Sequence, residues 1–344
     1  MGRRARDYDE RDVRVRPNRR GSRPRTKERP AHDDAVVGMV TAVDRGRWTA
    51  LVPADGEHPE RVVIAMRARE LGRTPIVVGD QVAMVGDTSG ADGSLARIVR
   101  VEERRSVLRR TADDTDPVER VIVANADQLV IVSALANPEP RPRLIDRCLV
   151  AAYDAGMDPL LVLTKSDLAR AEDFLAQYEP LGVPHVATAV LEPGSAGLEE
   201  LRGRLAGRVS VLVGHSGVGK STLVNALVPD ADRATGDVND VTGRGRHTST
   251  SAIALRLPGG PGGVGWIIDT PGIRSFGLAH VEPARIIEHF PDLAGGAEQG
   301  CPRGCTHDEP DCALDAWVAD GHAGPGGEGR LDSLRRLLRA RSDP

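Results

Sequence analysis

Aromatic residues are scarce in this chain, and long apolar runs are missing. Phenylalanine, tryptophan and tyrosine make up only 3% of the 344 residues, so the core must consist mainly of aliphatic side chains. No apolar run reaches the roughly 18 to 20 residues of a membrane helix, and the charged N-terminus lacks the apolar segment of a secretory signal. With 40% hydrophobic and 28% charged residues, the composition is typical of a globular protein. We therefore expect a cytoplasmic protein of two or three domains with no membrane partner.

Cysteine and lysine are rare enough for their positions to be informative. Cys148 lies in an apolar helical pattern, which is typical of a buried thiol. The only lysines are Lys27, Lys165 and Lys220, whereas arginine is abundant. Because arginine serves nearly everywhere, a retained lysine suggests a site that needs a compact ammonium group.

The first 34 residues differ in charge from the rest of the chain. They hold 12 Arg or Lys and 7 Asp or Glu, a net charge of +5, whereas the whole chain has a formal charge of −4. Large apolar residues are nearly missing here, so the segment cannot offset its own ordering entropy. We predict a disordered basic arm over 1–34. It is either a solvated tail or an arm that attracts nucleic-acid phosphates.

Three further regions follow the arm. Short β-branched runs over 35–108 predict a small five-stranded antiparallel barrel, with an OB-fold as first choice and an SH3-like barrel as second. Over 109–282, the apolar stretches VIVANADQLVIVSAL and PLLVLTKSDL read as continuous strands around a helical segment, which predicts an α/β domain with a parallel sheet. Residues 283–344 predict a small α domain whose last helix carries Leu331, Leu334, Leu337 and Leu338 on one face.

A phosphate-binding loop follows the strand VSVLV. The glycines let the backbone wrap an anion, and the helix that follows offers its N-terminal amides to phosphate. Lys220 is expected to reach the β- and γ-phosphates and Ser221 to ligate Mg²⁺. The whole candidate site is Gly214, His215, Ser216, Gly217, Val218, Gly219, Lys220, Ser221 and Thr222.

Two other motifs fit a guanine-nucleotide site. Asp269 ends the strand WIID and can hold a Mg²⁺-bound water, while Gly272 can offer its amide to the γ-phosphate. Residues 164–167 read Thr164, Lys165, Ser166 and Asp167, which resembles the [NT]KxD guanine motif. The Asp167 carboxylate can accept two hydrogen bonds from guanine, whereas adenine presents the opposite pattern. Residues 188–190 are a second candidate for base contact.

The order of these motifs differs from that of most small GTPases, in which the phosphate loop comes first and the base motif near the end. Here the base motif precedes the phosphate loop by about fifty residues, and DTPG comes last. This order is that of a circularly permuted GTPase. The sequence resembles the bacterial ribosome small-subunit-dependent GTPase A family, the RsgA/YjeQ type. The resemblance rests on VGD at 78–80, NADQ at 125–128, IDR at 145–147, TKSD, GHSGVGKST, GRHTST at 245–250, DTPGIRSFG at 269–277 and the terminal cysteines.

The resemblance implies an OB-fold barrel, a permuted GTPase domain and a zinc-binding C-terminal domain. It also implies GTP/GDP and Mg²⁺ as ligands, the 30S subunit and its 16S rRNA as partners, and GTP hydrolysis in late 30S maturation, stimulated by the subunit. We expect a monomer. Two rival functions stay open, namely a P-loop ATPase or kinase with a barrel, and an RNA-binding P-loop protein that uses nucleotide only as a structural or regulatory ligand.

The run of residues 242–250 is a natural first switch. Thr248 is our choice to close over Mg²⁺ and the γ-phosphate, with Thr250 as the alternative. Where Ras-like enzymes place a water-orienting glutamine, this chain has Ile273, whose apolar side chain cannot orient water. His247 is therefore the candidate that orients the attacking water, as the family resemblance also suggests. Its alternative roles are a solvated loop residue or an RNA contact.

Three cysteines and a histidine gather near the C-terminus, at Cys301, Cys305, His307 and Cys312. Three thiolates and an imidazole complete a tetrahedron around Zn²⁺ and leave no open position, so we predict one structural zinc ion. The first and third gaps are each one residue shorter than in the family that the chain resembles.

Overall fold

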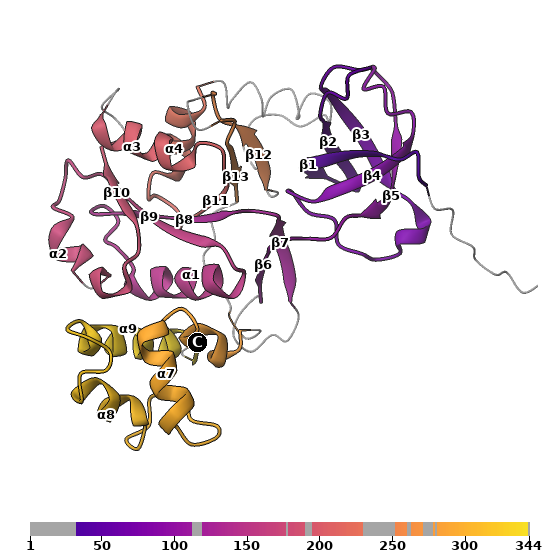
Figure 1. Cartoon of the computed structure of the whole chain (residues 1–344). Coiled ribbons are helices and arrows are strands. Elements are labelled where there is room, and N and C mark those ends of the chain that lie inside the picture. The colour runs from indigo at the N-terminus through magenta and orange to yellow at the C-terminus, as the bar shows by residue number, and fades with distance from the viewer. Residues whose placement is uncertain are drawn as a thin grey trace, which may run out of the picture. The chain divides into compact units, whose positions relative to one another are not determined.

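The structure of the chain is a computed structural model, shown in Figure 1. It describes residues 32–111, 119–176, 178–189, 195–229, 252–259, 263–270, 278 and 281–342. Residues 35–344 form one compact unit. The barrel, the α/β sheet and the C-terminal helices follow one another along the chain within this unit.

The N-terminal strands close into a five-stranded barrel. Its strands are β1 (Val36–Asp44), β2 (Arg47–Val52), β3 (Arg61–Arg67), β4 (Gln81–Gly86) and β5 (Ala96–Val101), with the 3₁₀ turn η3 (Arg69–Leu71) after β3. The order is β1-β2-β3-β5-β4, and β4 returns to pair with β1. Side chains alternate inward and outward, so Val40, Val63 and Ile98 are fully buried in the barrel core. The OB-type barrel is confirmed as the first choice over the SH3-like one. The prediction that every pair is antiparallel was wrong for one pair, because β3 and β5 run parallel.

The central strands are parallel except for the last one. In spatial order they are β10 (His185–Thr188), β9 (Asp158–Thr164), β8 (Gln128–Ala134), β11 (Val209–Val213), β13 (Trp266–Asp269) and β12 (Ile253–Arg256). Strand β12 is antiparallel to β13 and also pairs antiparallel with β1, so the barrel continues the same sheet. All seven residues of β8 are buried, because helices cover both faces of the sheet. The helices and turn of this region are α1 (Pro142–Asp154), α2 (Glu172–Leu175), η4 (Glu179–Leu181), α3 (Ala196–Leu205) and α4 (Lys220–Leu227).

The stretch VIVANADQLVIVSAL is two strands, which corrects the sequence-based prediction of one continuous strand. The first is β7 (Arg120–Ala124), which pairs with β6 (Val107–Arg110), and the second is β8. Asn125 separates them with a φ of 57°, a left-handed conformation that strands do not adopt.

The barrel contacts the central region at this break as well as through the β1–β12 pair. The buried Asn125 side chain donates to the Gly79 carbonyl at 2.9 Å and accepts from the Arg105 amide at 2.8 Å. Gly79 approaches so closely that a Cβ on it would lie 2.0 Å from the Ala124 carbonyl oxygen. The neighbouring carboxylate of Asp80 is fully buried and pairs with Arg104 at 2.7 Å. The VGD and NADQ motifs thus contact each other directly, between the barrel and the central sheet.

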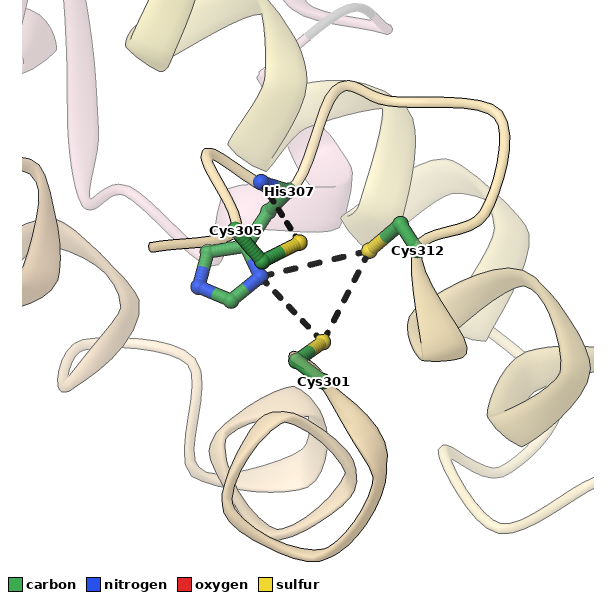
Figure 2. A group of neighbouring side chains, drawn as sticks. All are labelled: Cys301, Cys305, His307 and Cys312. Atoms are coloured by element: carbon green, nitrogen blue, oxygen red, sulfur yellow. Dashed lines mark hydrogen bonds between the residues drawn. The ribbon is translucent and has the colours of Figure 1, made fainter. Parts of the chain in front are cut away.

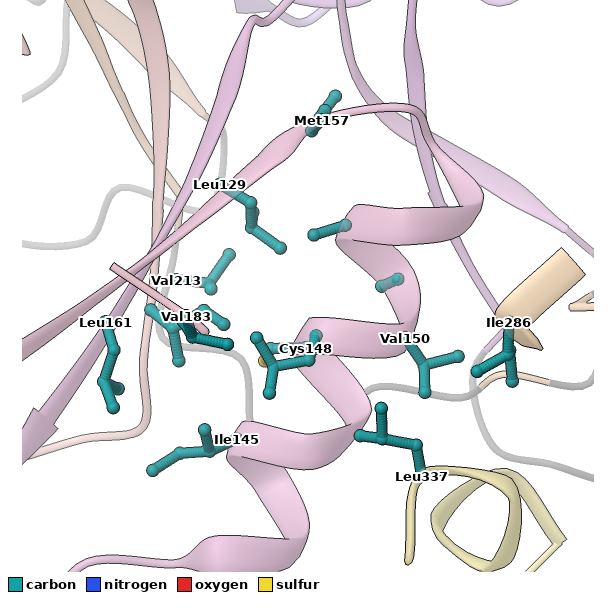
Figure 3. Close-up of a cluster of buried hydrophobic side chains, with 14 of the residues drawn as sticks. Leu129, Ile145, Cys148, Val150, Met157, Leu161, Val183, Val213, Ile286 and Leu337 are labelled. Atoms are coloured by element: carbon teal, nitrogen blue, oxygen red, sulfur yellow. The ribbon is translucent and has the colours of Figure 1, made fainter. Parts of the chain in front are cut away.

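The C-terminal region is helical. Its helices are α6 (Pro283–Ile287), α7 (Pro291–Gly300), α8 (Ala313–Ala319) and α9 (Gly327–Ser342). The leucine stripe predicted for the last helix is confirmed, because Leu331, Leu334, Leu337 and Leu338 are all buried. They share one core with α1 and one face of the sheet, as Figure 3 shows for Leu337. In the described part of the chain, no helix is both long and apolar enough to cross a bilayer.

Candidate guanine-nucleotide site and metal centre

The phosphate-loop sequence forms a turn between β11 and α4. Gly217 and Gly219 have φ values of 85° and 86°, a region that favours glycine. A Cβ on Gly214 would lie 2.6 Å from the Val132 carbonyl oxygen, so the turn can only pass β8 with glycine there. Lys220 begins the helix α4 and is buried, while the next two side chains, Ser221 and Thr222, are exposed on its first turn. A glycine-rich turn that leads into a helix N-terminus can bind an anion through backbone amides.

Lys220 and Asp269 are brought together by the parallel pairing of β11 and β13. The register sets Leu212 beside Asp269, and the Thr270 hydroxyl donates to the Leu212 carbonyl at 2.7 Å. The Lys220 ammonium donates to the Asp269 carboxylate and, at 2.5 Å, to the Thr270 carbonyl. Two residues predicted from separate motifs therefore form one charged pair at the end of the sheet.

The base motif contacts the phosphate loop directly. Thr164 is buried at the end of β9, and its hydroxyl donates to the Val218 carbonyl at 2.6 Å. Lys165 has a φ of 59°, and its ammonium donates to the Gly217 carbonyl at 3.1 Å and to the Asn137 carbonyl. The hydrogen bond between Thr164 and Val218 joins residues that lie 54 positions apart in the sequence.

The other predicted base contacts lie at the same end of the sheet. Asp167 is exposed just beyond β9, where its carboxylate is accessible. The Ser166 amide donates to the Thr188 carbonyl at 3.4 Å, which places the second candidate loop beside the TKSD segment. In the phosphate loop, His215 is buried and its Nδ1 lies 2.9 Å from the Ser216 carbonyl.

Several predicted residues lie outside the described residues. They are His247, Thr248, Thr250, Gly272 and Ile273, together with Val190 of the second base loop.

The cysteines and the histidine converge at the start of α8, as Figure 2 shows. Cys301 Sγ lies 3.5 Å from His307 Nδ1 and 3.8 Å from Cys312 Sγ, and these last two atoms are 3.9 Å apart. Cys305 completes the group, and all four ligand atoms lie within 4.8 Å of one another. A Zn–S bond of about 2.3 Å gives a tetrahedron with S–S edges of about 3.8 Å. The shorter sequence gaps are therefore compatible with a tetrahedral zinc site.

Burial affects the two kinds of ligand differently. It raises the pKa of the Cys305 and Cys312 thiols, which opposes the thiolate form that a metal requires. His307 reaches the cluster with a φ of 65°, and burial lowers the pKa of its ring, which favours the neutral imidazole that a metal requires. The described cysteines are all free thiols, so none is diverted into a disulfide.

Comparisons with known proteins show which family the chain belongs to. A family model described as RsgA GTPase matches residues 101–279. The chain belongs to the RsgA GTPase family. The small ribosomal subunit biogenesis GTPase RsgA of Pseudomonas aeruginosa (strain LESB58) is 43% identical over 274 residues, which cover 76% of this chain and 75% of that protein.

Solved structures are similar over nearly the whole chain. The crystal structure of YjeQ from Thermotoga maritima has a TM-score of 0.60 at 27% identity, covering 90% of this chain and 99% of its own. YloQ, described as a circularly permuted GTPase, has a TM-score of 0.60 at 22% identity and supports the fold, covering 91% of this chain and 97% of its own. The circularly permuted order predicted from the sequence is thereby confirmed.

Sequence reasoning missed two contributors to the site. Asn137 and Pro138 follow β8, and their loop contacts both Lys165 and the phosphate loop. The Asn-Pro pair directly after a buried strand was the available signal. Glu309 accepts from the Thr306 amide at 3.0 Å and from its hydroxyl at 2.9 Å, and these bonds lower the pKa of Glu309 to about 2. Its place between two predicted metal ligands was the corresponding signal.

Proposed function

We propose that this protein is a GTPase that binds the small ribosomal subunit and hydrolyses GTP when docked there, during late maturation of that subunit. Family membership and the names of the relatives support this activity and this process. The partner is the 30S subunit, contacted through 16S rRNA, and the protein acts as a monomer.

The observation that carries the proposal is the contact between the base motif and the phosphate loop. The Thr164 hydroxyl bonds Val218, and the Lys165 ammonium bonds Gly217, so the two motifs form one site. In this arrangement, Asp167 is the group that accepts from the guanine N1–H and exocyclic amine. A threonine in place of asparagine keeps the contact to the loop, because its hydroxyl is a sufficient donor.

The charged pair at the sheet end supplies the phosphate and magnesium contacts. Lys220 binds the β- and γ-phosphates, and the hydroxyl of Ser221 with the carboxylate of Asp269 holds Mg²⁺ and its water. Thr248 would close over the ion, and the Gly272 amide would contact the γ-phosphate. When bound, Mg²⁺ neutralises charge that develops on the phosphate oxygens. In the described structure, the Asp269 carboxylate pairs with the Lys220 ammonium, so both charges are compensated.

The cysteine and histidine group holds a structural zinc ion. Cys301, Cys305, His307 and Cys312 supply four protein ligands, which leaves no position for a substrate. Zinc supplies the cross-link that orders the loop between α7 and α8.

Water for hydrolysis is oriented by His247, since Ile273 has no polar group to do so. Docking on the subunit brings His247 within about 2.6 to 3.2 Å of the attacking water. The free enzyme is accordingly slow.

The test is the rate of GTP hydrolysis as a function of 30S concentration, with 50S particles for comparison. His247→Ala should still bind GTP and 30S, but its ribosome-stimulated rate of GTP hydrolysis should fall by about ten- to a thousandfold. Lys220→Ala should impair nucleotide handling with or without ribosomes. His185→Ala is the matched control, because this histidine is exposed at the opposite end of β10 from Thr188.

The outcomes are distinct. Full stimulation in His247→Ala would move the water-orienting role to Thr250 or to a ribosomal group. Nucleotide binding without turnover under any condition would favour the alternative, an RNA-binding P-loop protein with nucleotide as a structural or regulatory ligand.

A further inference from the structure

The helix α1 is buried on two sides. One side packs on the sheet through Ile145 and Cys148, which Figure 3 shows directed towards Val183 and Val213. On another side, Val150 lies beside Leu337 of α9 and Ile286 of α6 in the same view. An α-helix that packs on two partners needs two apolar stripes, and α1 has both.

Polar contacts line the side of α1 that meets the C-terminal helices. The Asp146 carboxylate is 2% exposed and lies 3.0 Å from Arg336 Nε of α9. The Arg336 guanidinium also stands 5.0 Å from the centre of the Tyr178 ring. One residue further along α1, Arg147 donates to the Ala340 carbonyl at 2.5 Å near the end of α9. Asp146 and Arg147 belong to the IDR motif, to which the nucleotide site gives no role.

The last turn of α1 is held by the same C-terminal region. Arg285 of α6 donates to the Asp154 carboxylate at 2.8 Å and to its carbonyl at 2.9 Å. The rings of Tyr153 and His289 stack with centres 4.4 Å apart. Val150, Tyr153 and Asp154 follow Asp146 by four, seven and eight residues, and these spacings place all four on one face of the helix.

The other end of α1 leads to the nucleotide site. The loop before the helix carries Asn137, whose carbonyl accepts from the Lys165 ammonium. It also carries Pro138, whose Cδ is 3.6 Å from the position of a Cβ on Gly217. A rigid helix therefore connects α9 with the residues that hold the base motif on the phosphate loop.

We propose that α1 transmits the position of the C-terminal domain to the nucleotide site and thereby sets the rate at which GDP is released, with Asp146 and Arg336 as the transmitting contact. The proposal rests on the guanine-nucleotide site proposed above. A buried ion pair adds little net stability compared with apolar side chains, but removing one partner leaves an uncompensated charge. Asp146 and Arg336 are positioning residues, and they fix where α9 sits on α1.

Release of a fluorescent GDP analogue, chased with excess GDP and without ribosomes, tests this coupling. Arg336→Met should accelerate release by about fivefold or more, the low end of typical couplings between sites, because it leaves the buried Asp146 carboxylate without its countercharge. The double variant, Asp146→Leu with Arg336→Met, should return release towards the wild-type rate, because it restores a neutral contact. Arg339→Met is the matched control, since this α9 arginine pairs with Asp308 at the surface and not with α1.

Hydrogen exchange of the α9 amides reports docking in the same variants. Faster exchange together with faster release in Arg336→Met, and recovery of both in the double variant, supports the proposal. Faster exchange with unchanged release would overturn it, because α9 would move without effect on the site. Unchanged exchange would overturn it as well, since the pair would not fix α9. A wild-type protein that binds no guanine nucleotide would instead refute the proposed function.

Discussion

Replacing Asp146 with asparagine should change how the stability of the α1–α9 contact depends on pH. Burial raises the pKa of the Asp146 carboxyl from its ordinary 3.8 to about 6, although Arg336 and the Tyr178 hydroxyl act in the opposite direction. The folded protein therefore binds this proton more tightly than the unfolded chain does. The stabilising contribution is complete below about pH 3.8 and is lost as the pH rises to about 6.

The magnitude follows from the pKa. A change from 3.8 to about 6 corresponds to about 3 kcal/mol of unfolding free energy, since one pKa unit is about 1.4 kcal/mol. This is the cost of ionising a carboxyl that is 2% exposed, after the attraction of Arg336 has been counted. Asparagine has a similar shape and does not titrate, so the variant should lack this decline.

The assay is hydrogen exchange of the α1 and α9 amides between about pH 4 and pH 7, in the wild type and in Asp146→Asn. The exchange is corrected for intrinsic rates. A local readout is preferable, because a chain with several domains need not unfold in one step. Titration of the metal ligands occurs in the wild type and in the variant, so it cancels when the two stability curves are subtracted. The reasoning is refuted if the two stability curves run parallel across this range.

Three further changes test the site, the metal centre and the contact between the barrel and the central sheet. Asp167→Asn should lose roughly 2 to 3 kcal/mol of GTP binding and gain affinity for xanthosine triphosphate, measured by calorimetry, and unchanged GTP affinity would contradict the role of TKSD. The wild-type chain should contain about one zinc ion, and Cys305→Ala should lose it, unfold the C-terminal domain and weaken 30S binding with GTP binding nearly intact. Metal-free protein with a folded C-terminal domain would count against this. Gly79→Ala should destabilise the chain by about 3 kcal/mol or more in thermal unfolding, because its Cβ would lie 2.0 Å from the Ala124 carbonyl oxygen. Gly46→Ala, also at positive φ but with open space around it, should cost only about 1 to 2 kcal/mol.

The chemistry-bearing motifs were readable from the sequence alone, because each is a run of neighbouring residues. A phosphate loop needs glycines beside a lysine and a serine, and these stand together at Gly219, Lys220 and Ser221. A zinc site needs four ligands within a short span, which the residues 301–312 provide. The alternation of the barrel strands and the leucine stripe of α9 were also local signals.

What lies far apart in the chain was decided only by the tertiary structure. The Thr164 hydroxyl bonds the Val218 carbonyl because β9 and β11 lie on either side of β8 in a parallel sheet. Nothing in the sequence indicates that contact. The break at Asn125 depends on Gly79 of the barrel, whereas the local apolar pattern favoured one continuous strand. Helix α1 shows the same limit. Its pattern reveals an amphipathic helix, but periodicity records that a face is apolar and not which partner covers it, so its contact with Arg336 required the folded chain.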